Sequence, residues 1–79
     1  FTVYILHSEV IDRFYVGYTN DLERRISEHN RKKGKFTDRG IPWKIVYTER
    51  FDSKAEAIKR ERFIKSKKSR EFIMKLISW

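Results

Sequence analysis

The chain has 79 residues, with 19 Lys and Arg against 11 Asp and Glu, which gives a formal net charge of +8. A chain of this length is expected to form one small domain over residues 1–79, which excludes an enzyme whose cleft lies between two lobes. The absence of cysteine excludes a disulfide framework, and no apolar run approaches the roughly 18 residues of a membrane span, so we expect a cytoplasmic protein without a membrane partner.

The first third of the chain predicts a β-hairpin followed by a short helix. The β-branched and aromatic run over residues 2–6 indicates a buried strand, and residues 14–18 indicate a second strand joined to it by a short polar turn. Gly17 lies inside the second strand, where glycine usually marks a bulge or a close approach to the backbone. Residues 19–21 supply capping oxygens for a helix over about residues 22–30.

The remaining chain predicts one more strand and two more helices. We expect a basic loop over residues 31–39, a strand over residues 43–51, and a helix that starts at a capping box over residues 53–56 and ends near residue 65. Ser69 is expected to cap a last helix that runs through Ile77. The order β-β-α-β-α-α indicates the α+β class, with helices packed on one small mixed sheet.

Two polar residues lie on the apolar stripe of the first predicted helix. Arg25 and His29 are one turn apart and share this stripe with Leu22 and Ile26. One interpretation is structural: Arg25 extends from the core margin to solvent, and His29 is a hydrogen-bonded histidine near the end of the helix. The other interpretation is that both residues belong to a functional site.

A carboxylate also points inward on the second predicted helix. Glu61 lies three residues after Ile58 and three before Ile64, so helical spacing places it on the buried side. Glutamate is rarely buried without a partner. Glu61 therefore either forms an ion pair with a basic neighbour or holds a divalent cation.

Tyrosines are spread over the predicted strands, where most tyrosines simply pack. Tyr4 and Tyr15 are eleven residues apart on the two strands of the hairpin, so we expect them to lie opposite each other on one face. A phenol with a pKa near ~10 is a poor base unless a cation stabilises its phenolate.

The net charge of +8 favours a polyanionic partner, and nucleic acid is the commonest one. Two basic segments are candidates to contact phosphates, although such runs are often only solvated surface. The candidate nucleic-acid-binding residues are Lys32, Lys33, Lys35, Arg39, Lys65, Lys67, Lys68 and Arg70.

Taken in order, these residues resemble the motifs of the GIY-YIG nuclease superfamily. The resemblance covers essentially the whole chain and is strongest to small single-domain bacterial members; it extends to structure-specific resolvases and the nuclease domain of excision nucleases. Tyr18 stands where excision nucleases carry lysine, and no asparagine fills the late position that many members have. The matching residues are Thr2-Val3-Tyr4, Tyr15-Val16-Gly17, Arg25, His29 and Glu61.

The resemblance implies a three-stranded antiparallel sheet flanked by helices. It also implies an endonuclease that needs Mg²⁺ or Mn²⁺ and hydrolyses a phosphodiester bond in nucleic acid. DNA is favoured over RNA, and we expect DNA of non-standard structure, as in DNA repair, with a partner protein as one means of choosing the substrate.

The same resemblance implies a role for each motif residue. Glu61 is the metal ligand, and Tyr4 is the general base, with its pKa lowered by nearby cations. Tyr15 orients water or phosphate, although the roles of the two tyrosines are interchangeable. Arg25 stabilises charge on the phosphate, His29 assists positioning or proton transfer, and Gly17 keeps the backbone close to the site.

Two other functions stay open on the sequence alone. One is a non-catalytic nucleic-acid-binding module that keeps the fold and the basic surface. The other is an interaction domain in which the positive charge serves an acidic protein partner.

Overall fold

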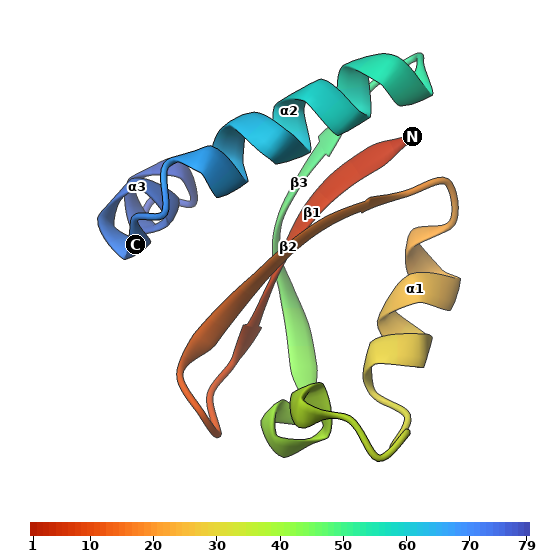
Figure 1. Cartoon of the computed structure of the whole chain (residues 1–79), viewed down its shortest axis with the longest axis vertical. Coiled ribbons are helices and arrows are strands. Elements are labelled where there is room, and N and C mark those ends of the chain that lie inside the picture. Colours follow the sequence, from red (N-terminus) through yellow and green to blue (C-terminus); the bar gives the residue numbers. More distant parts are fainter.

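A computed structural model describes all 79 residues and has the order β-β-α-β-α-α, with one additional short helix (Figure 1). The strands are β1 (Thr2–Ser8), β2 (Arg13–Thr19) and β3 (Trp43–Arg50), and they form one sheet in the order β2-β1-β3. Both strand pairs are antiparallel, so the sheet is fully antiparallel rather than mixed. Because β1 is central, β2 leaves one edge of the sheet without a strand partner.

The helices begin at the capping residues that the sequence predicts. They are α1 (Leu22–His29), α2 (Lys54–Ser66) and α3 (Arg70–Leu76). In each case the side chain before the helix accepts a backbone N–H from its first turn, which satisfies an otherwise free donor. The capping residues are Asp21, Ser53 and Ser69. None of the helices is both long and apolar enough to cross a membrane.

The expected loop over residues 31–39 is only partly a loop. Residues Phe36–Gly40 form a short 3₁₀ helix. The carboxylate of Asp38 accepts the backbone N–H groups of Lys33, Gly34 and Lys35 at 2.9, 2.6 and 3.2 Å, which folds the segment back on itself. This turn could not be predicted from the sequence, because Lys33, Gly34 and Lys35 form no hydrophobic pattern.

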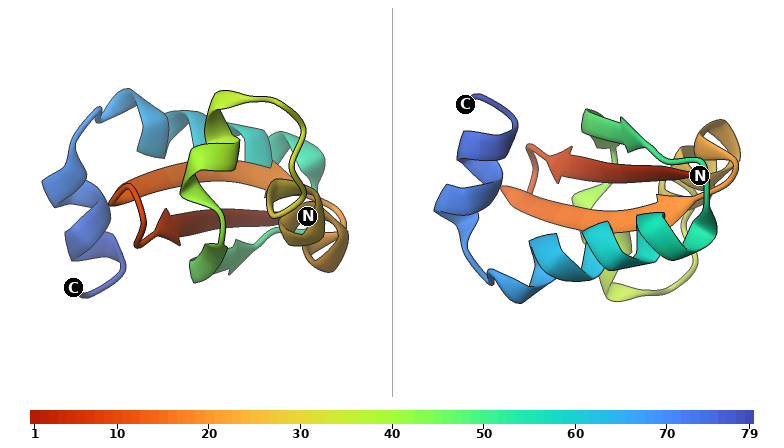
Figure 2. Two further views of the ribbon diagram at one scale, coloured as in Figure 1. Left: turned by 90° about the horizontal axis from the view of Figure 1, so that it is seen from below. Right: turned by 90° about the horizontal axis from the view of Figure 1, so that it is seen from above.

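Helices cover both faces of the sheet, with α2 and α3 on one side and α1 on the other (Figures 1 and 2). The core is therefore divided by the sheet. Val3, Ile5 and Val16 pack with Ala57 and Ile64 under α2 and α3. On the opposite face, the second core cluster is formed by Tyr4, Leu6 and Trp43, with Leu22 and Ile26 of α1 packed against it.

The hairpin register decides how the two motif tyrosines lie. Tyr4 pairs with Gly17, and Leu6 pairs with Tyr15. The expectation that Tyr4 and Tyr15 lie directly opposite each other is therefore wrong: they share one face but are diagonal neighbours. Pairing Tyr4 with Tyr15 instead of Gly17 would need a register shift of two residues. The alternation of side chains between the two faces is unchanged by a shift of an even number of residues, so the sequence pattern does not distinguish the two registers.

Gly17 is a place of close approach and not a bulge. The irregularity in the sheet lies instead in the β1–β3 pairing, between Ile5 and Leu6. A Cβ atom added to Gly17 would lie 2.5 Å from the Oη atom of Tyr4 and 2.7 Å from its Cζ atom. The ring of Tyr4 thus lies over the Gly17 backbone, and only glycine leaves room for it.

Candidate active site

A polar pocket of about 430 Å³ opens beside β2, between α1 and α2. Its walls come from both sides of the sheet, because α1 and α2 cover opposite faces and both contribute residues to the lining. The motif residues that line it are Tyr4, Tyr15, Val16, Gly17, Arg25 and Glu61. The structure therefore brings together residues from four different elements that are up to 57 positions apart in the sequence.

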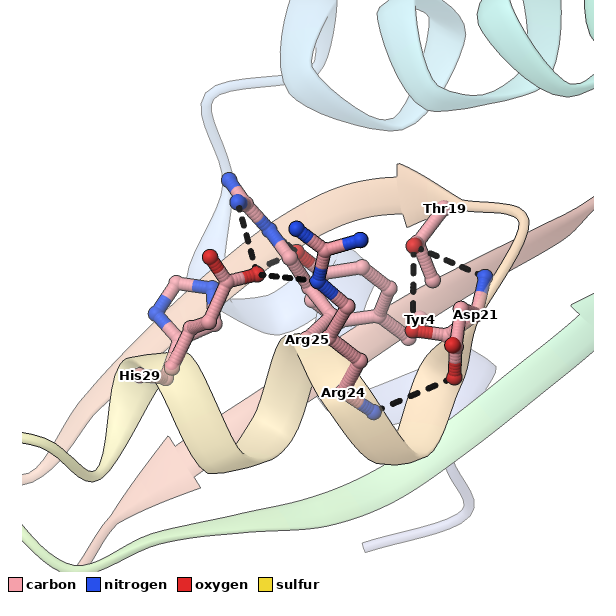
Figure 3. Close-up of polar contacts among 7 residues, drawn as sticks. Tyr4, Thr19, Asp21, Arg24, Arg25 and His29 are labelled. Carbon is pink, nitrogen blue, oxygen red and sulfur yellow. Dashed lines mark hydrogen bonds and ion pairs between the residues drawn. The ribbon is translucent and has the colours of Figure 1, made fainter.

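The hydroxyl of Tyr4 has polar contacts with two side chains of α1, Arg25 and His29 (Figure 3). Tyr4 is 1% exposed. Its Oη atom accepts a hydrogen bond from Nε of Arg25 at 3.3 Å and also lies 3.3 Å from Nε2 of His29. Arg25 has only donors, so the hydrogen of the Tyr4 hydroxyl is left for His29 or for a molecule in the pocket.

The pKa of Tyr4 differs from the expectation. Burial is the largest effect and raises the pKa of Tyr4 above its usual value, and the hydrogen bond and charge of Arg25 offset only part of this. The negative charge of Glu61 raises it further. The cation Arg25 does lower the pKa of this phenol, but burial outweighs it, so the net lowering that was expected is not found in the protein by itself.

His29 lies behind Tyr4, away from the pocket opening. It is 6% exposed, and the ring of Tyr15 meets it edge-on with 4.5 Å between ring centroids. Burial lowers the pKa of His29, and the positive charges of Arg25 and Lys33 lower it further. At neutral pH the ring is therefore uncharged, and one of its nitrogens is free to accept a hydrogen bond.

Glu61 points into the pocket from α2, as its helical spacing predicts. Its side chain is 13% exposed, and its charged partner is Lys65, whose Nζ atom is 3.5 Å from Oε2. Both interpretations of this carboxylate thus have support, because an i,i+4 ion pair of this length leaves most of its oxygen lone pairs free. Glu56, the other glutamate of α2, is exposed and serves the capping box with Ser53.

Glu28 is a pocket residue that sequence reasoning missed. Its carboxylate lies 3.8 Å from Arg25 and 4.0 Å from Arg24. The sequence did offer one signal, because Glu28 lies three residues after Arg25 and four after Arg24, and these spacings make side chains neighbours on a helix. The same spacing also describes ordinary surface ion pairs, so it does not by itself indicate a site.

The two basic segments differ in position. Lys65, Lys68 and Arg70 border a second groove next to the pocket, whereas Lys67 lies over the rings of Phe63 and Phe72. The other basic segment lies on the α1 side of the sheet. None of its members lines the pocket: Lys32, Lys33, Lys35 and Arg39.

The fold and the pocket define a small α+β protein with a tyrosine, arginine and carboxylate cluster at a free sheet edge. A family model described as "GIY-YIG catalytic domain" matches residues 1–76. The chain therefore belongs to the GIY-YIG family, whose members are in general endonucleases.

Several curated relatives carry the name UPF0213 protein. One from Natronomonas pharaonis is 48% identical over 65 residues, which are 81% of this chain and 75% of the relative. One from Staphylococcus saprophyticus is 49% identical over 65 residues, again 81% of this chain and 78% of the relative. One from Halobacterium salinarum is 49% identical over 53 residues, 66% of this chain and 69% of the relative. No solved structure matches the chain.

Proposed function

We propose that this protein is an endonuclease that depends on a divalent cation and hydrolyses a phosphodiester bond in nucleic acid, with DNA of non-standard structure as its substrate. One observation carries the proposal: Tyr4, Arg25 and Glu61 come from three elements and converge on one pocket at the free edge of β2. A proton acceptor, a cation for phosphate and a carboxylate are the groups that this hydrolysis needs.

The chemistry of the donor set fits a hard cation such as Mg²⁺ or Mn²⁺. The pocket has no group of three or more His, Asp or Glu side chains that would make a complete protein cage. Glu61 offers one carboxylate beside open space, and Mg²⁺ commonly keeps several waters and takes only one or two carboxylates. Bound there, the ion would supply Lewis-acid polarisation of the scissile phosphate.

Tyr4 and His29 provide a path for the proton of the attacking water. The raised pKa of Tyr4 means that its hydroxyl stays protonated at rest. To accept a proton from water, Tyr4 must pass its own proton on, and the neutral Nε2 of His29 lies 3.3 Å away. Tyr4 is thus the group that contacts water, and His29 is the acceptor behind it.

Arg25 holds Tyr4 and faces the phosphate at the same time. Nε is hydrogen-bonded to Tyr4, whereas NH1 has only Glu28 at 3.8 Å. The terminal nitrogens are therefore available for phosphate oxygens, which arginine binds in a bidentate manner, and they stabilise negative charge that builds up there. Tyr15 orients the water or the phosphate in this proposal, which its place in the pocket lining supports.

A cleavage screen tests this proposal. Purified protein is incubated with branched, nicked, flapped, duplex and single-stranded DNA, and with RNA, in Mg²⁺ or Mn²⁺. We expect cleavage, and we expect chelation of the metal to abolish it. Each of the substitutions Glu61→Ala, Tyr4→Phe and Arg25→Ala should reduce the cleavage rate by about 10²-fold or more, which is the order of magnitude for the loss of one catalytic group. Activity that survives all three substitutions would contradict the proposal, because a contaminating nuclease would then explain it.

A non-catalytic nucleic-acid-binding module is the second candidate. The ion pair between Lys65 and Glu61 supports this candidate, because the lysine already supplies a positive charge beside the carboxylate that would hold a metal ion. Nucleic-acid binding without cleavage over the same substrates and metals is the result that this candidate predicts.

A further inference from the structure

A second groove continues the candidate active-site pocket along β2 toward the hairpin turn. It measures about 680 Å³ and lies between the β2 end of the hairpin and the α2–α3 junction. The pocket and the groove share Tyr15, Val16 and Lys65. They are therefore two parts of one continuous channel along the free edge of the sheet, and α2 follows β2 along this edge (Figure 2).

The groove is more basic than the pocket. Its lining carries one acidic side chain, Asp12, and four basic ones: Arg13, Lys65, Lys68 and Arg70. Asp12 is neutralised by Arg70, whose NH2 atom is 2.7 Å from its carboxylate. The pocket, in contrast, balances its basic residues with Asp21, Glu28 and Glu61.

Two cations of the groove are free of acidic partners. Arg13 and Lys68 are exposed and form no ion pair, whereas Arg70 is held by Asp12 and packs over the ring of Phe14. Lys65 is shared with Glu61 at the junction of pocket and groove. Unpaired charges that border a channel are well placed for an anion, because binding then breaks no existing contact.

We propose that a nucleic-acid strand leaves the reacting phosphate along the free edge of β2 and continues into this groove, with Arg13, Lys65 and Lys68 contacting its phosphates. This inference rests on the proposed nuclease function. From Gly17 to Arg13 the strand β2 rises about 14 Å. That is the axial length of about four nucleotides of one DNA strand. The basic loop with Lys32, Lys33 and Lys35 lies outside this path.

A salt series of binding measurements tests the path. Fluorescence anisotropy with a labelled oligonucleotide is measured in chelator, so that no cleavage occurs and no metal is needed. The double variant Arg13→Gln/Lys68→Gln removes two charges from the groove, and Lys59→Gln/Lys75→Gln removes two exposed charges from the same layer of the molecule outside it. The groove variant is expected to reduce the slope of log affinity against log salt by about 1.4 for single strands or 1.8 for duplex. The control is expected to keep the slope of the unmodified protein.

The outcomes separate this inference from the proposed function. Equal loss of slope in both double variants, or no loss in either, would overturn the path along β2 even if the protein cuts DNA. A protein that binds no nucleic acid at any salt concentration would overturn the proposed function itself. Circular dichroism of both variants checks that neither has unfolded, and Arg13→Lys/Lys68→Arg keeps the charge and is expected to keep the slope.

Discussion

At the scale of single residues, the pair of Tyr4 and Gly17 connects the fold to the chemistry. Tyr4 is buried, and its ring crosses over the backbone of Gly17 to line the pocket. Arg25 and His29 then hold this hydroxyl from α1. The glycine therefore serves the position of a neighbouring side chain and not the flexibility of its own strand.

Gly17→Ala is expected to destabilise the protein by about 1–3 kcal/mol, because the added Cβ overlaps the buried ring of Tyr4. Cleavage should also fall, since the Tyr4 hydroxyl must move away from Arg25 and His29. The free energy of unfolding is measured in urea, for Gly17→Ala both alone and in a Tyr4→Ala background. An equal cost in the two backgrounds would show that the ring is not the cause.

His29 is expected to make stability depend on pH. Burial and the charges of Arg25 and Lys33 lower its pKa in the folded protein, whereas in the unfolded chain a histidine titrates near about 6.5. The stability is therefore fully present above that pH and falls as pH drops below it, because the unfolded chain binds the proton more readily.

The test is urea unfolding between about pH 7.5 and about pH 5.5. We expect the unmodified protein to lose stability over this interval and His29→Gln to lose much less. Tyr4 and Tyr15 from the hairpin and Glu28 from α1 also face this ring or its charged neighbours. Identical curves for His29→Gln and the unmodified protein would refute the assignment.

At the scale of the elements, Asn30 ties the end of α1 to the start of β3. Its Oδ1 atom accepts the backbone N–H of Trp43 at 2.6 Å, and its Nδ2 atom donates to the carbonyl of the same residue at 3.0 Å. This contact fixes α1 against the sheet and hence the places of Arg25 and His29. Asn30 therefore acts on the candidate site through the position of a helix.

Asn30→Ala is expected to cost about 1–3 kcal/mol, because it leaves the backbone N–H of buried Trp43 without a partner. Arg31→Ala, an exposed neighbour, should change stability by no more than about 0.5 kcal/mol. Thermal or urea unfolding of the two variants decides the matter, and equal stabilities would show that the Asn30 contact contributes little.

The elements themselves could be predicted because their signals are local. Capping residues fixed the start of each of the three α-helices, and β-branched runs fixed the strands to within two residues at either end. The inward direction of Glu61 also followed from helical spacing. The diagonal placement of Tyr4 and Tyr15 did not, because it depends on the hairpin register. Likewise, the meeting of Glu61 with Tyr4 around a sheet edge depends on which helix covers which face.

At the scale of the whole molecule, the two basic segments that contribute to the net charge of +8 lie in different places relative to the channel. One basic segment borders the channel along β2, and the other lies on the opposite layer, where Lys33 lowers the pKa of His29. Composition alone made the two segments equivalent. The sheet lies between α2 on one side and α1 on the other (Figure 1). This arrangement decides which basic residues face the channel and which do not.

The proposed function requires that the pocket at the free edge of β2 cuts nucleic acid with the help of a cation held by Glu61. The most direct test compares single-turnover cleavage by Glu61→Gln and Glu56→Gln as Mn²⁺ is titrated, because both variants remove one carboxylate from α2. We expect Glu56→Gln to match the unmodified protein and Glu61→Gln to lose at least 10²-fold in rate at saturating Mn²⁺. Equal rates for the two variants would contradict the claim.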